Sequence, residues 1–332
     1  MLVFLTPIFQ IMIILTGAAG FIGSCMLAKL NQEGYKDIVL VDDFTKTAKF
    51  PNFSNKIFSS IVPRADLFVW LAAQTAPIQA VIHLGARTDT TEKNSAIFEE
   101  LNLTYSQKLW TYCTDLQIPF IYASSAATYG DGSLGFNDDE ALITQLKPLN
   151  PYGQSKHDFD CWVLAQEKKP HFWAGLKFFN IYGPNEYHKG RMASVVFHAF
   201  GQIQHAGYLR LFRSHRPEYA DGEQLRDFVY VKDVTEVILF LMNTRYRSGI
   251  YNLGTGQART FLSLGEATFA ALNLKPSIQF VDIPEDIRES YQYFTEAKME
   301  RLRDVGYHRP FVTLEEGISD YVQQYLLFQK YW

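Results

Sequence analysis

The chain has 332 residues, of which 47% are hydrophobic and 20% charged, a globular composition that excludes disordered and fibrous classes. Its 31 basic and 35 acidic residues give a net charge of −4, so we expect neither nucleic acid nor a membrane as a partner. The three cysteines are too few for a disulfide framework and fit no zinc site, which predicts a reducing, cytoplasmic compartment and no metal.

The first eleven residues are apolar but lack the marks of a targeting signal. They carry no basic residue and no cleavage site of small residues, both of which a signal peptide requires. They are also shorter than the roughly 20 apolar residues of a transmembrane helix. We therefore predict that residues 1–11 are an extension ahead of a start at Met12, or a loosely packed tail.

Strand and helix patterns alternate along the first half of the chain. A continuous apolar run predicts a strand buried on both faces, and apolar residues at helical spacing predict the helices between such strands. The predicted strands lie at 11–16, 37–42, 80–85, 119–124 and 173–179, and the predicted helices at 24–33, 94–116 and 152–168. This alternation predicts an α/β fold with a doubly wound, parallel Rossmann sheet.

The pattern becomes irregular after residue 180, where glycine, proline and polar residues mark loops. We predict a Rossmann domain at 12–179 and a smaller, mainly substrate-binding part at 180–332. The two parts are expected to interleave, because part of 227–255 should return to the Rossmann sheet.

Gly17, Gly20 and Gly23 have the spacing GxxGxxG between a predicted strand and a predicted helix. The first glycine permits a tight turn, the second lets the backbone approach a pyrophosphate, and the third lets the helix pack against the strand. The helix N-terminus adds amide donors and a partial positive charge. We therefore predict a dinucleotide site at this turn.

The end of the second strand bears on the choice between NAD and NADP. Asp42 follows Gly23 by 19 residues, the place where an acid can bind the adenosine ribose, and Asp43 beside it favours NAD. Lys46 and Lys49 follow closely and can neutralise a 2′-phosphate. The residues alone leave both cofactors open.

Tyr152 and Lys156 form a YxxxK pair at the start of a predicted helix, where a spacing of four puts both on one face. We expect the Lys156 ammonium to lower the pKa of the Tyr152 phenol, so that Tyr152 acts as a general base or acid at a substrate hydroxyl. Ser125 follows a strand and can hydrogen-bond the same oxygen. These three side chains predict a catalyst that works with a nicotinamide cofactor.

The chain resembles the extended short-chain dehydrogenase/reductase family across nearly its whole length, and within that family the ADP-L-glycero-D-manno-heptose 6-epimerases. The stretches that carry the resemblance include TGAAGFIGS, YASSAATYG, NPYGQSK, FFNIYGPNEYHKGRMASVVFH, RDFVYVKDV, GIYNLGTG and YQYFTEAKMERLRDVGY. The most specific of them is the sequence His188-Lys189-Gly190, in which the family's matching lysine is a second acid/base. Lys189 is thereby implied to work opposite Tyr152.

The resemblance implies an isomerase that inverts carbon 6 of the heptose in ADP-D-glycero-D-manno-heptose by transient oxidation with bound NADP. It also implies a nucleotide sugar as the small-molecule partner and a homo-oligomer, pentamers among the family's forms. The implied cofactor contacts, beyond the glycines, are Phe21, Ile22, Asp42, Asp43, Lys49, Arg64, Leu84, Gly85, Ala86, Asn102, Tyr152, Lys156 and Ile181. The implied substrate contacts are Ser125, Asn180, Arg191, His198, Phe212, Arg226 and Tyr291.

Several positions depart from the family's pattern. The loop Leu84–Thr88 replaces a more acidic version, Arg191 stands where serine is common, and the loop between Phe212 and Arg226 is longer than usual. Arg226 can bind the ADP phosphates with two parallel hydrogen bonds. The alternative for Arg226 is a structural ion pair with Asp227 or Glu223.

Three other functions can be weighed against the pattern. A UDP-hexose 4-epimerase shares Ser125, Tyr152 and Lys156 but has no need of Lys189. A dinucleotide-binding regulator without catalysis is disfavoured, because such proteins lose the tyrosine or lysine of the YxxxK pair. A sugar dehydratase is disfavoured because Ala126 and Ala127 occupy the place of its acid/base pair.

Overall fold

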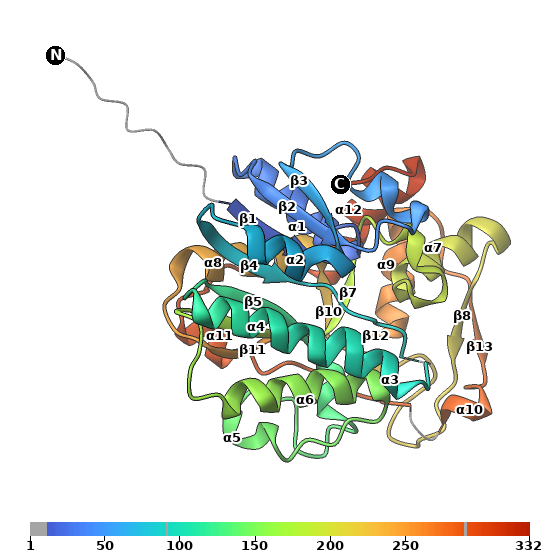
Figure 1. Ribbon diagram of the computed structural model, residues 1–332. Helices are drawn as coiled ribbons and strands as arrows, with labels where there is room; N and C mark the ends of the chain where they lie inside the picture. Colours follow the sequence, from blue (N-terminus) through green and yellow to red (C-terminus); the bar gives the residue numbers. More distant parts are fainter. Residues whose placement is uncertain (1–11, 91, 289–290) are drawn as a thin grey trace.

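A parallel sheet of seven strands forms the centre of the protein in the computed structural model, which describes residues 12–90, 92–288 and 291–332 (Figure 1). The predicted extension at 1–11 lies outside the described residues. The strand order is β11-β6-β5-β4-β1-β2-β3, which confirms the predicted doubly wound α/β fold. The strands are β1 (Met12–Thr16), β2 (Ile38–Asp42), β3 (Ser60–Pro63), β4 (Ile78–His83), β5 (Phe120–Ser125), β6 (Trp173–Phe178) and β11 (Gly249–Leu253).

The strand residues alternate between two hydrophobic cores, one on each face of the sheet. In β1, Ile13 and Leu15 belong to the first core and Ile14 to the second, and all three side chains are fully buried. Helices α1 (Phe21–Gln32), α8 (Val231–Thr244) and α11 (Glu300–Asp304) cover the first core, and α2 (Leu67–Ala73), α4 (Tyr105–Asp115) and α6 (Pro151–Ala165) the second. Burial on both faces explains why these strands have continuous apolar sequences.

The chain reverses its direction across the sheet at β1, which pairs with β2 on one side and with β4 on the other. The connections leaving β1 and β4 therefore separate at their carboxyl ends, where open α/β sheets bind ligands. Backbone hydrogen bonds fix both connections there, since Gly17 N donates to Val41 O at 2.8 Å and Leu84 N donates to Thr16 O at 3.2 Å. This geometry positions the site described below.

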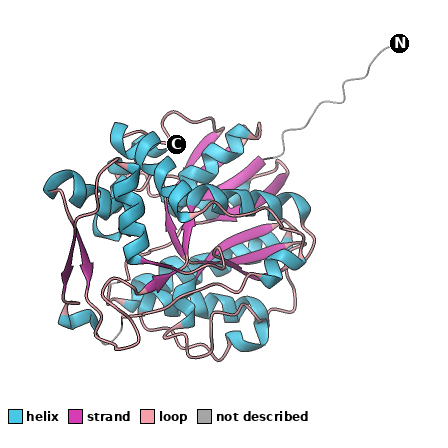
Figure 2. Cartoon of the chain, turned by 180° about the vertical axis from the view of Figure 1, so that it is seen from behind, coloured by secondary structure: helices cyan, strands magenta, loops and turns pink. Residues whose placement is uncertain are grey.

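A second, smaller part packs around a hydrophobic core of its own. Its two-stranded sheets pair β7 (Asn180–Tyr182) with β10 (Phe228–Tyr230), β8 (Leu209–Phe212) with β13 (Ile278–Val281), and β9 (Leu225–Arg226) with β12 (Arg259–Thr260). The β8–β13 pair stands apart from the central sheet (Figure 2). The remaining helices are α3 (Ser95–Phe98), α5 (Glu140–Ile143), α7 (Val195–Ala206), α9 (Phe261–Ala271), α10 (Glu285–Arg288) and α12 (Leu314–Asp320).

The two parts share helix α1 and exchange chain segments. Phe21 and Cys25 of α1 belong to the core of the smaller part, whereas Met26 and Leu27 belong to the first core of the sheet. The chain also returns to the central sheet with β11 after it has built several elements of the smaller part. Within the described ranges, no helix combines the length and apolarity needed to cross a bilayer.

Several elements of the Rossmann part differ from the sequence-based expectations. The helix predicted at 94–116 is interrupted, because α3 runs into a π-helical turn at Glu99–Thr104 before α4 begins. The strand β3 and the helix α2 were not predicted at all. Only Val62 of β3 is buried, so this edge strand lacks the apolar run that marks the inner strands.

A fully buried ion pair joins β6 to α6. Lys177 Nζ lies 2.7 Å from Asp160 Oδ2, and both side chains are completely shielded from solvent. Lys177 also donates to Thr128 Oγ1 at 2.7 Å, while Asp160 accepts hydrogen bonds from Ser124 and Tyr122 of β5. Because every donor here has a carboxylate or hydroxyl acceptor, the pair fixes the end of β5 against its neighbours.

Replacing Lys177 with methionine tests this role. Lys177→Met leaves the Asp160 carboxylate buried without a counter-charge, and we expect the free energy of unfolding to fall by about 3–5 kcal/mol in urea denaturation. The matched control is Lys275→Met at an exposed lysine, with an expected change within about 0.5 kcal/mol. Equal losses in the two variants would show that the pair has no special role in stability.

Candidate active site

A cavity of about 620 Å³ opens at the carboxyl ends of the central strands. Thr16 of β1, Asp42 of β2 and Ser125 of β5 each contribute to its wall from the last position of their strand. The predicted site residues that line it are Gly17, Gly20, Phe21, Ile22, Gly23, Asp42, Asp43, Lys49, Arg64, Leu84, Gly85, Ala86, Ser125, Tyr152, Ile181 and Lys189. Most of the predicted cofactor contacts thus meet in one place.

The glycine turn between β1 and α1 leaves no room for side chains. Gly17 has a φ of +68°, and a Cβ placed on it would lie 2.6 Å from the backbone nitrogen of Gly85. A Cβ on Gly23 would lie 2.1 Å from the carbonyl oxygen of Gly17. Gly20 caps α1 without a side-chain hydrogen bond, so the first amides of the helix remain available to an anion. The turn therefore fits a bound pyrophosphate.

Asp42 holds the glycine turn in place. Its carboxylate accepts hydrogen bonds from Ala19 N at 3.0 Å and from Asp43 N at 2.7 Å, and Lys49 Nζ lies 2.8 Å from its Oδ1. The charge of Asp42 is thus balanced by Lys49, and much of its capacity to accept hydrogen bonds is already used.

Three cations and two carboxylates surround the part of the cavity beyond β2. Lys46 Nζ lies 3.9 Å from Asp43 Oδ2, and Arg64 lines the same wall. The Thr45 hydroxyl, which donates to Asp43, lowers the pKa of that carboxyl. Lys46, Lys49 and Arg64 together outweigh the two acids, so this wall has net positive charge.

Helix α6 presents Tyr152 to the cavity and holds Lys156 behind it. The helix begins where it does because Asn150 Oδ1 accepts a hydrogen bond from Gly153 N at 2.8 Å and Pro151 occupies the first turn. Lys156 is 5% exposed, and its ammonium donates to Ala123 O at 2.8 Å. Burial lowers the pKa of Lys156 to about 8, and among the described residues Lys156 lies outside the cavity wall.

In this structure, burial of the Tyr152 phenol opposes the effect that is expected of Lys156. Burial raises the pKa of Tyr152, and the hydrogen bond with the Ser125 side chain offsets only part of that rise. The Lys156 ammonium is directed to a backbone carbonyl instead of the phenol. Tyr152 and Ser125 line the cavity together, where both can contact a substrate oxygen.

Lys189 reaches the same cavity from a separate loop. The helical turns at Tyr187–Met192 are interrupted at Gly190, whose φ of +53° bends the backbone beside Lys189. The Lys189 Nζ atom lies 5.0 Å from the centre of the Phe21 ring. Burial lowers the pKa of Lys189, so its ammonium gives up a proton more readily than a solvated lysine does.

A chain of ion pairs links the loop after β4 to the Lys189 loop. Arg191 lies 3.3 Å from Asp89, and Arg87 lies 3.5 Å from the same carboxylate. Arg87 and Asp89 line the cavity, whereas Arg191 lies outside that lining and its side chain is 69% exposed. Arg87 and Arg191, which both depart from the family's pattern, thus pair with the same carboxylate, that of Asp89.

Three of the predicted substrate residues form a cluster outside the cavity wall. The rings of Phe212 and Tyr291 lie 5.9 Å apart, and the Arg226 guanidinium lies 5.3 Å from the Tyr291 ring. Arg226 donates to the backbone oxygens of Leu225 and Gln292, and the described ion pairs join it to neither of the acids considered as alternatives.

The other predicted residues surround the site without lining the cavity. Asn180 is exposed at the start of β7, and His198 Nε2 lies 3.3 Å from the carbonyl oxygen of Arg191. Asn102 is buried, accepts from Arg87 N at 2.7 Å and donates to Ser155 Oγ at 2.9 Å. Asn102 therefore supports the loop after β4 from behind.

The cavity is also lined by residues that were not predicted from the sequence. They are Thr16, Val41, Arg87, Thr88, Asp89, Ile97, Leu101, Tyr105, Phe178, Phe179, His188 and Met192. For Thr16, Val41 and Phe178 a signal existed, because each lies at the end of a predicted strand and thus at the binding edge of the sheet. Ile97 and Leu101 gave no such signal, since they look like ordinary apolar helix positions.

The comparison with protein families agrees with this geometry. Residues 13–254 match the model of the NAD dependent epimerase/dehydratase family, which covers more than half of the chain. The chain belongs to this family.

Relatives in this epimerase/dehydratase family are similar over nearly the full length. The chain is 47% identical to the ADP-L-glycero-D-manno-heptose-6-epimerase of Fusobacterium nucleatum, over 95% of this chain and 98% of that protein. It is 48% identical to the enzyme of the same name from Nitratidesulfovibrio vulgaris, with the same coverage. Among solved structures, the Helicobacter pylori ADP-L-glycero-D-manno-heptose-6-epimerase matches with a TM-score of 0.77 and 28% identity, over 94% of this chain and 95% of that one.

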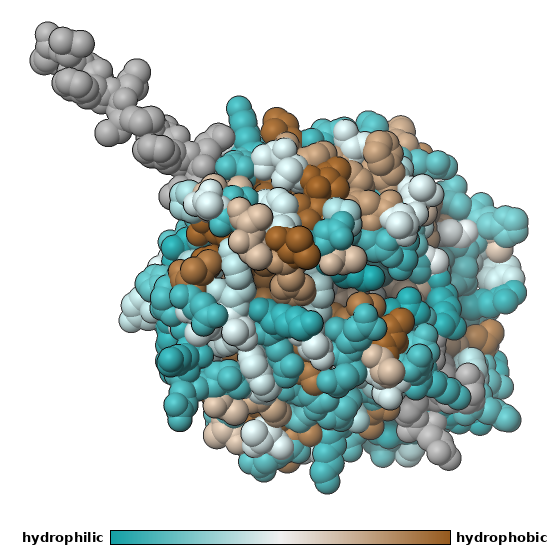
Figure 3. Space-filling view, viewed as in Figure 1, coloured by the Kyte–Doolittle hydropathy of each residue, from teal (hydrophilic) through white to brown (hydrophobic). Residues whose placement is uncertain are grey.

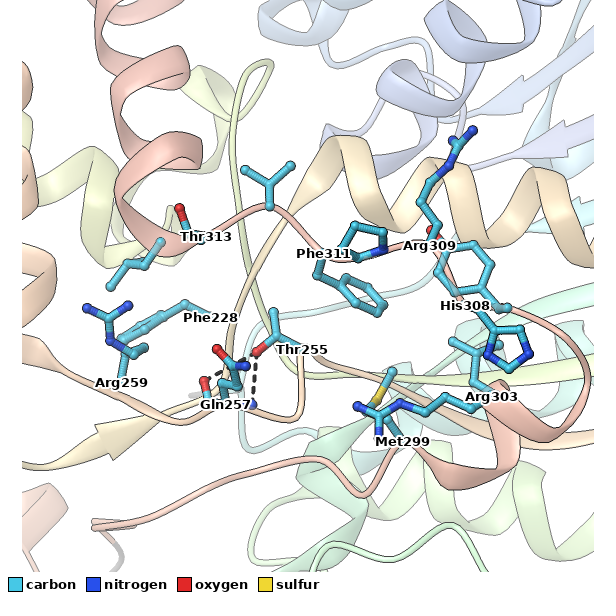
Figure 4. Close-up of a pocket in the computed structure, with 15 residues that line it drawn as sticks. Phe228, Thr255, Gln257, Arg259, Met299, Arg303, His308, Arg309, Phe311 and Thr313 are labelled. Atoms are coloured by element: carbon cyan, nitrogen blue, oxygen red, sulfur yellow. Dashed lines mark hydrogen bonds between the residues drawn. The ribbon is translucent and has the colours of Figure 1, made fainter.

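A second cavity, of about 280 Å³, lies near α11 and the start of α12 (Figure 4). It is lined by Arg259, Arg303, His308 and Arg309 together with apolar side chains such as Phe311. Arg259 is paired with a carboxylate outside the cavity, as is Arg309. Among the described residues that line this cavity there is no lysine and no carboxylate.

Two helical glycines allow a matched test of the cofactor turn. Gly23→Ala places a methyl group against the Gly17 carbonyl, and we expect loss of detectable dinucleotide binding and a fall of about 1–3 kcal/mol in the free energy of unfolding. The control is Gly201→Ala in α7, where a Cβ meets nothing within 4 Å and alanine should stabilise the helix by about 0.5–1 kcal/mol. Calorimetric titration with NADP and urea denaturation measure both effects, and normal binding by Gly23→Ala would contradict the assignment of this turn.

Proposed function

We propose that this protein inverts carbon 6 of the heptose in ADP-D-glycero-D-manno-heptose, using bound NADP and the proton-transfer groups Tyr152 and Lys189. The product, ADP-L-glycero-D-manno-heptose, supplies heptose for the lipopolysaccharide core. One observation carries the proposal: Tyr152 on α6 and Lys189 on the 187–192 loop line the same cavity beside the glycine turn. The 47% identity to a 6-epimerase over 95% of the chain supports it.

Two proton-transfer groups match the chemistry of inversion at a carbon that carries a hydroxyl. The glycine turn at Gly17, Gly20 and Gly23 would hold the nicotinamide cofactor, which would supply the hydride chemistry at carbon 6 by way of a transient ketone. Because the hydroxyl oxygen lies in a different place in each epimer, one group cannot serve both epimers. Tyr152 exchanges the hydroxyl proton of one epimer, assisted by Ser125, and Lys189 exchanges that of the other.

The residues beyond β2 favour NADP over NAD. Asp42 is already bonded to the glycine turn and balanced by Lys49, so it is poorly placed to select an unmodified ribose. Lys46 and Arg64 line the cavity nearby and supply the positive charge that a 2′-phosphate requires.

The surface and the resemblance suggest the protein's assembly and location. We propose that the protein is a homo-oligomer, a pentamer by resemblance, located in the cytoplasm. The side chains of Phe50, Ile57, Ile61 and Val69 are 43–78% exposed around β3 and α2. Figure 3 shows hydrophobic residues gathered on the face that carries these elements, the kind of surface that a second copy covers.

The reaction itself provides the first test. Incubation with ADP-D-glycero-D-manno-heptose should convert it to the L-glycero epimer, observed by NMR, and Lys189→Met should slow this conversion by about 10²-fold or more while NADP remains bound. The exposed control Lys275→Met should be as active as the parent.

Other outcomes identify the alternatives. Unchanged substrate together with turnover of UDP-galactose would replace the proposal with a UDP-hexose 4-epimerase, for which Lys189→Met should have little effect. Tight dinucleotide binding without turnover of any ADP- or UDP-sugar would indicate a non-catalytic regulator.

The cofactor preference is tested at Arg64. Arg64→Ala removes one cation from the wall that faces the 2′-phosphate, and we expect NADP to bind about tenfold more weakly while NAD binding changes little. Titration of both cofactors measures the ratio, with Arg210→Ala at an exposed arginine as the control. Equal weakening of both cofactors would place Arg64 away from the 2′-phosphate.

A further inference from the structure

Glu186 is a buried carboxylate beside the Lys189 loop with no role in the mechanism above. Its side chain is 0% exposed. The carboxylate accepts hydrogen bonds from Ser194 N and Ser194 Oγ, both at 2.6 Å, and from the Tyr321 hydroxyl at 3.0 Å. Ser194 caps α7 and Tyr321 belongs to the C-terminal helical segment, so Glu186 joins both to the start of the loop.

Three hydrogen-bond donors point at the Glu186 carboxylate, and this arrangement bears on whether the group is protonated or ionised. A protonated Glu186 would turn one of its acceptor oxygens into a donor that faces other donors. Burial raises the pKa of Glu186 above its usual value, and the Lys189 charge and the bonds from Ser194 and Tyr321 offset only part of that rise. The three hydrogen bonds are nevertheless best satisfied by the ionised form.

The C-terminal segment holds the same loop at a second place. Asn185 donates to Trp332 O at 3.1 Å and accepts from Trp332 N at 2.8 Å. The Tyr187 hydroxyl donates to the backbone oxygens of Tyr325 and Lys330, at 3.2 Å and 3.1 Å. The residues on both sides of Glu186 are thus tied to the end of the chain.

Lys189 lies on the loop that Glu186 and the C-terminal segment hold in place. Lys189 N donates to Glu186 O at 3.0 Å, so the lysine is one turn away from the buried carboxylate. The described ion pairs include no direct contact between the Glu186 carboxylate and the Lys189 ammonium. The Lys189 side chain extends instead over Phe21, into the cavity that Tyr152 also lines. Glu186 thus fixes the backbone below Lys189 and leaves the ammonium available to substrate.

We propose that Glu186 is a positioning residue for Lys189, and that it acts by fixing the 187–192 loop to α7 and to Tyr321 of the C-terminal segment. This inference rests on the proposed function, because it assumes that Lys189 exchanges the proton of one epimer. Its consequence is selective: a loosened loop impairs the half-reaction that uses Lys189 and spares the half-reaction that uses Tyr152, Ser125 and α6.

The test compares the two half-reactions in single turnovers. The protein with NADP bound is mixed with each epimer of ADP-heptose in turn, and reduction of the nicotinamide is followed by its fluorescence. Lys189→Met first identifies the epimer whose oxidation depends on Lys189. Glu186→Gln should then slow oxidation of the same epimer by about tenfold or more, because a misplaced catalytic group loses efficiency steeply, and should change oxidation of the other epimer less than about twofold.

A milder variant and a matched control keep the result interpretable. Tyr321→Phe removes one of the three donors and keeps the ring, so it should show the same selectivity with a smaller effect. It decides the question if Glu186→Gln fails to fold or to bind NADP. Asp233→Asn alters another buried carboxylate, which accepts from Val312 N at 2.9 Å away from the Lys189 loop, and should show no selectivity between the epimers.

The outcomes separate this inference from the proposed function. Equal slowing of both epimers in Glu186→Gln and Tyr321→Phe, or no slowing in either variant, would overturn the role of Glu186 while Lys189→Met still shows selectivity. If Lys189→Met itself slows both epimers equally or neither, the assignment of Lys189 as the second acid/base is wrong, and the role of Glu186 is overturned with it.

Discussion

The close approach of two backbone segments at the turn after β1 is the constraint on which the site depends. The carbonyl of Gly17 lies where a side chain on Gly23 would begin, and the amide of Gly85 lies where a side chain on Gly17 would begin. Only glycine satisfies both contacts, and they bring α1, β1 and the loop after β4 together at one point. The cavity opens at that point because the connections from β1 and β4 separate there.

Charge at this turn is balanced locally. Asp42 accepts from the amide of Ala19 inside the turn and pairs with Lys49, so an acid that looks like a ribose ligand in the sequence has a structural task as well. The sequence shows that Asp42 and Lys49 are present, but not that the Asp42 carboxylate pairs with Lys49 and accepts from Ala19 N. The same limit applies to Lys156, whose ammonium lies close enough to Tyr152 in sequence to bind it but donates to Ala123 O.

The inner strands and the first turn of α6 were predictable because local physics decides them. Ile13 to Leu15 are buried on both faces of the sheet, and Asn150 with Pro151 is a strong start signal for a helix. The edge strand β3 and the π-helical turn before α4 were not predictable in this way. Val62 alone is buried in β3, and a π-helical turn differs from an α-helical one in its backbone hydrogen bonds, which the sequence does not reveal.

The candidate site was predictable where a motif and its strand or helix coincide, as at Gly17, Ser125 and Tyr152. The candidate site was less predictable at residues that were named only because of the resemblance to a family. Arg226 and Tyr291 contact each other outside the cavity wall, and Arg191 turns to Asp89, a partner on a loop 102 residues away in the chain. Such pairings depend on how distant loops meet, and spacing in the sequence carries no information about them.

Phe21 connects the glycine turn, where α1 begins, with the loop that carries Lys189. It is the first residue of α1, directly after Gly20, and its ring lies under the Lys189 ammonium. The first residue of α1, the helix proposed to bind the phosphates, therefore also contacts Lys189, the proposed second proton-transfer group. A reaction that returns a hydride to the opposite face of a ketone needs its two proton donors fixed relative to the cofactor and not only to each other. The position of Tyr152 relative to the cofactor site is fixed by α6 and the sheet, and that of Lys189 is fixed by its contact with Phe21 of α1.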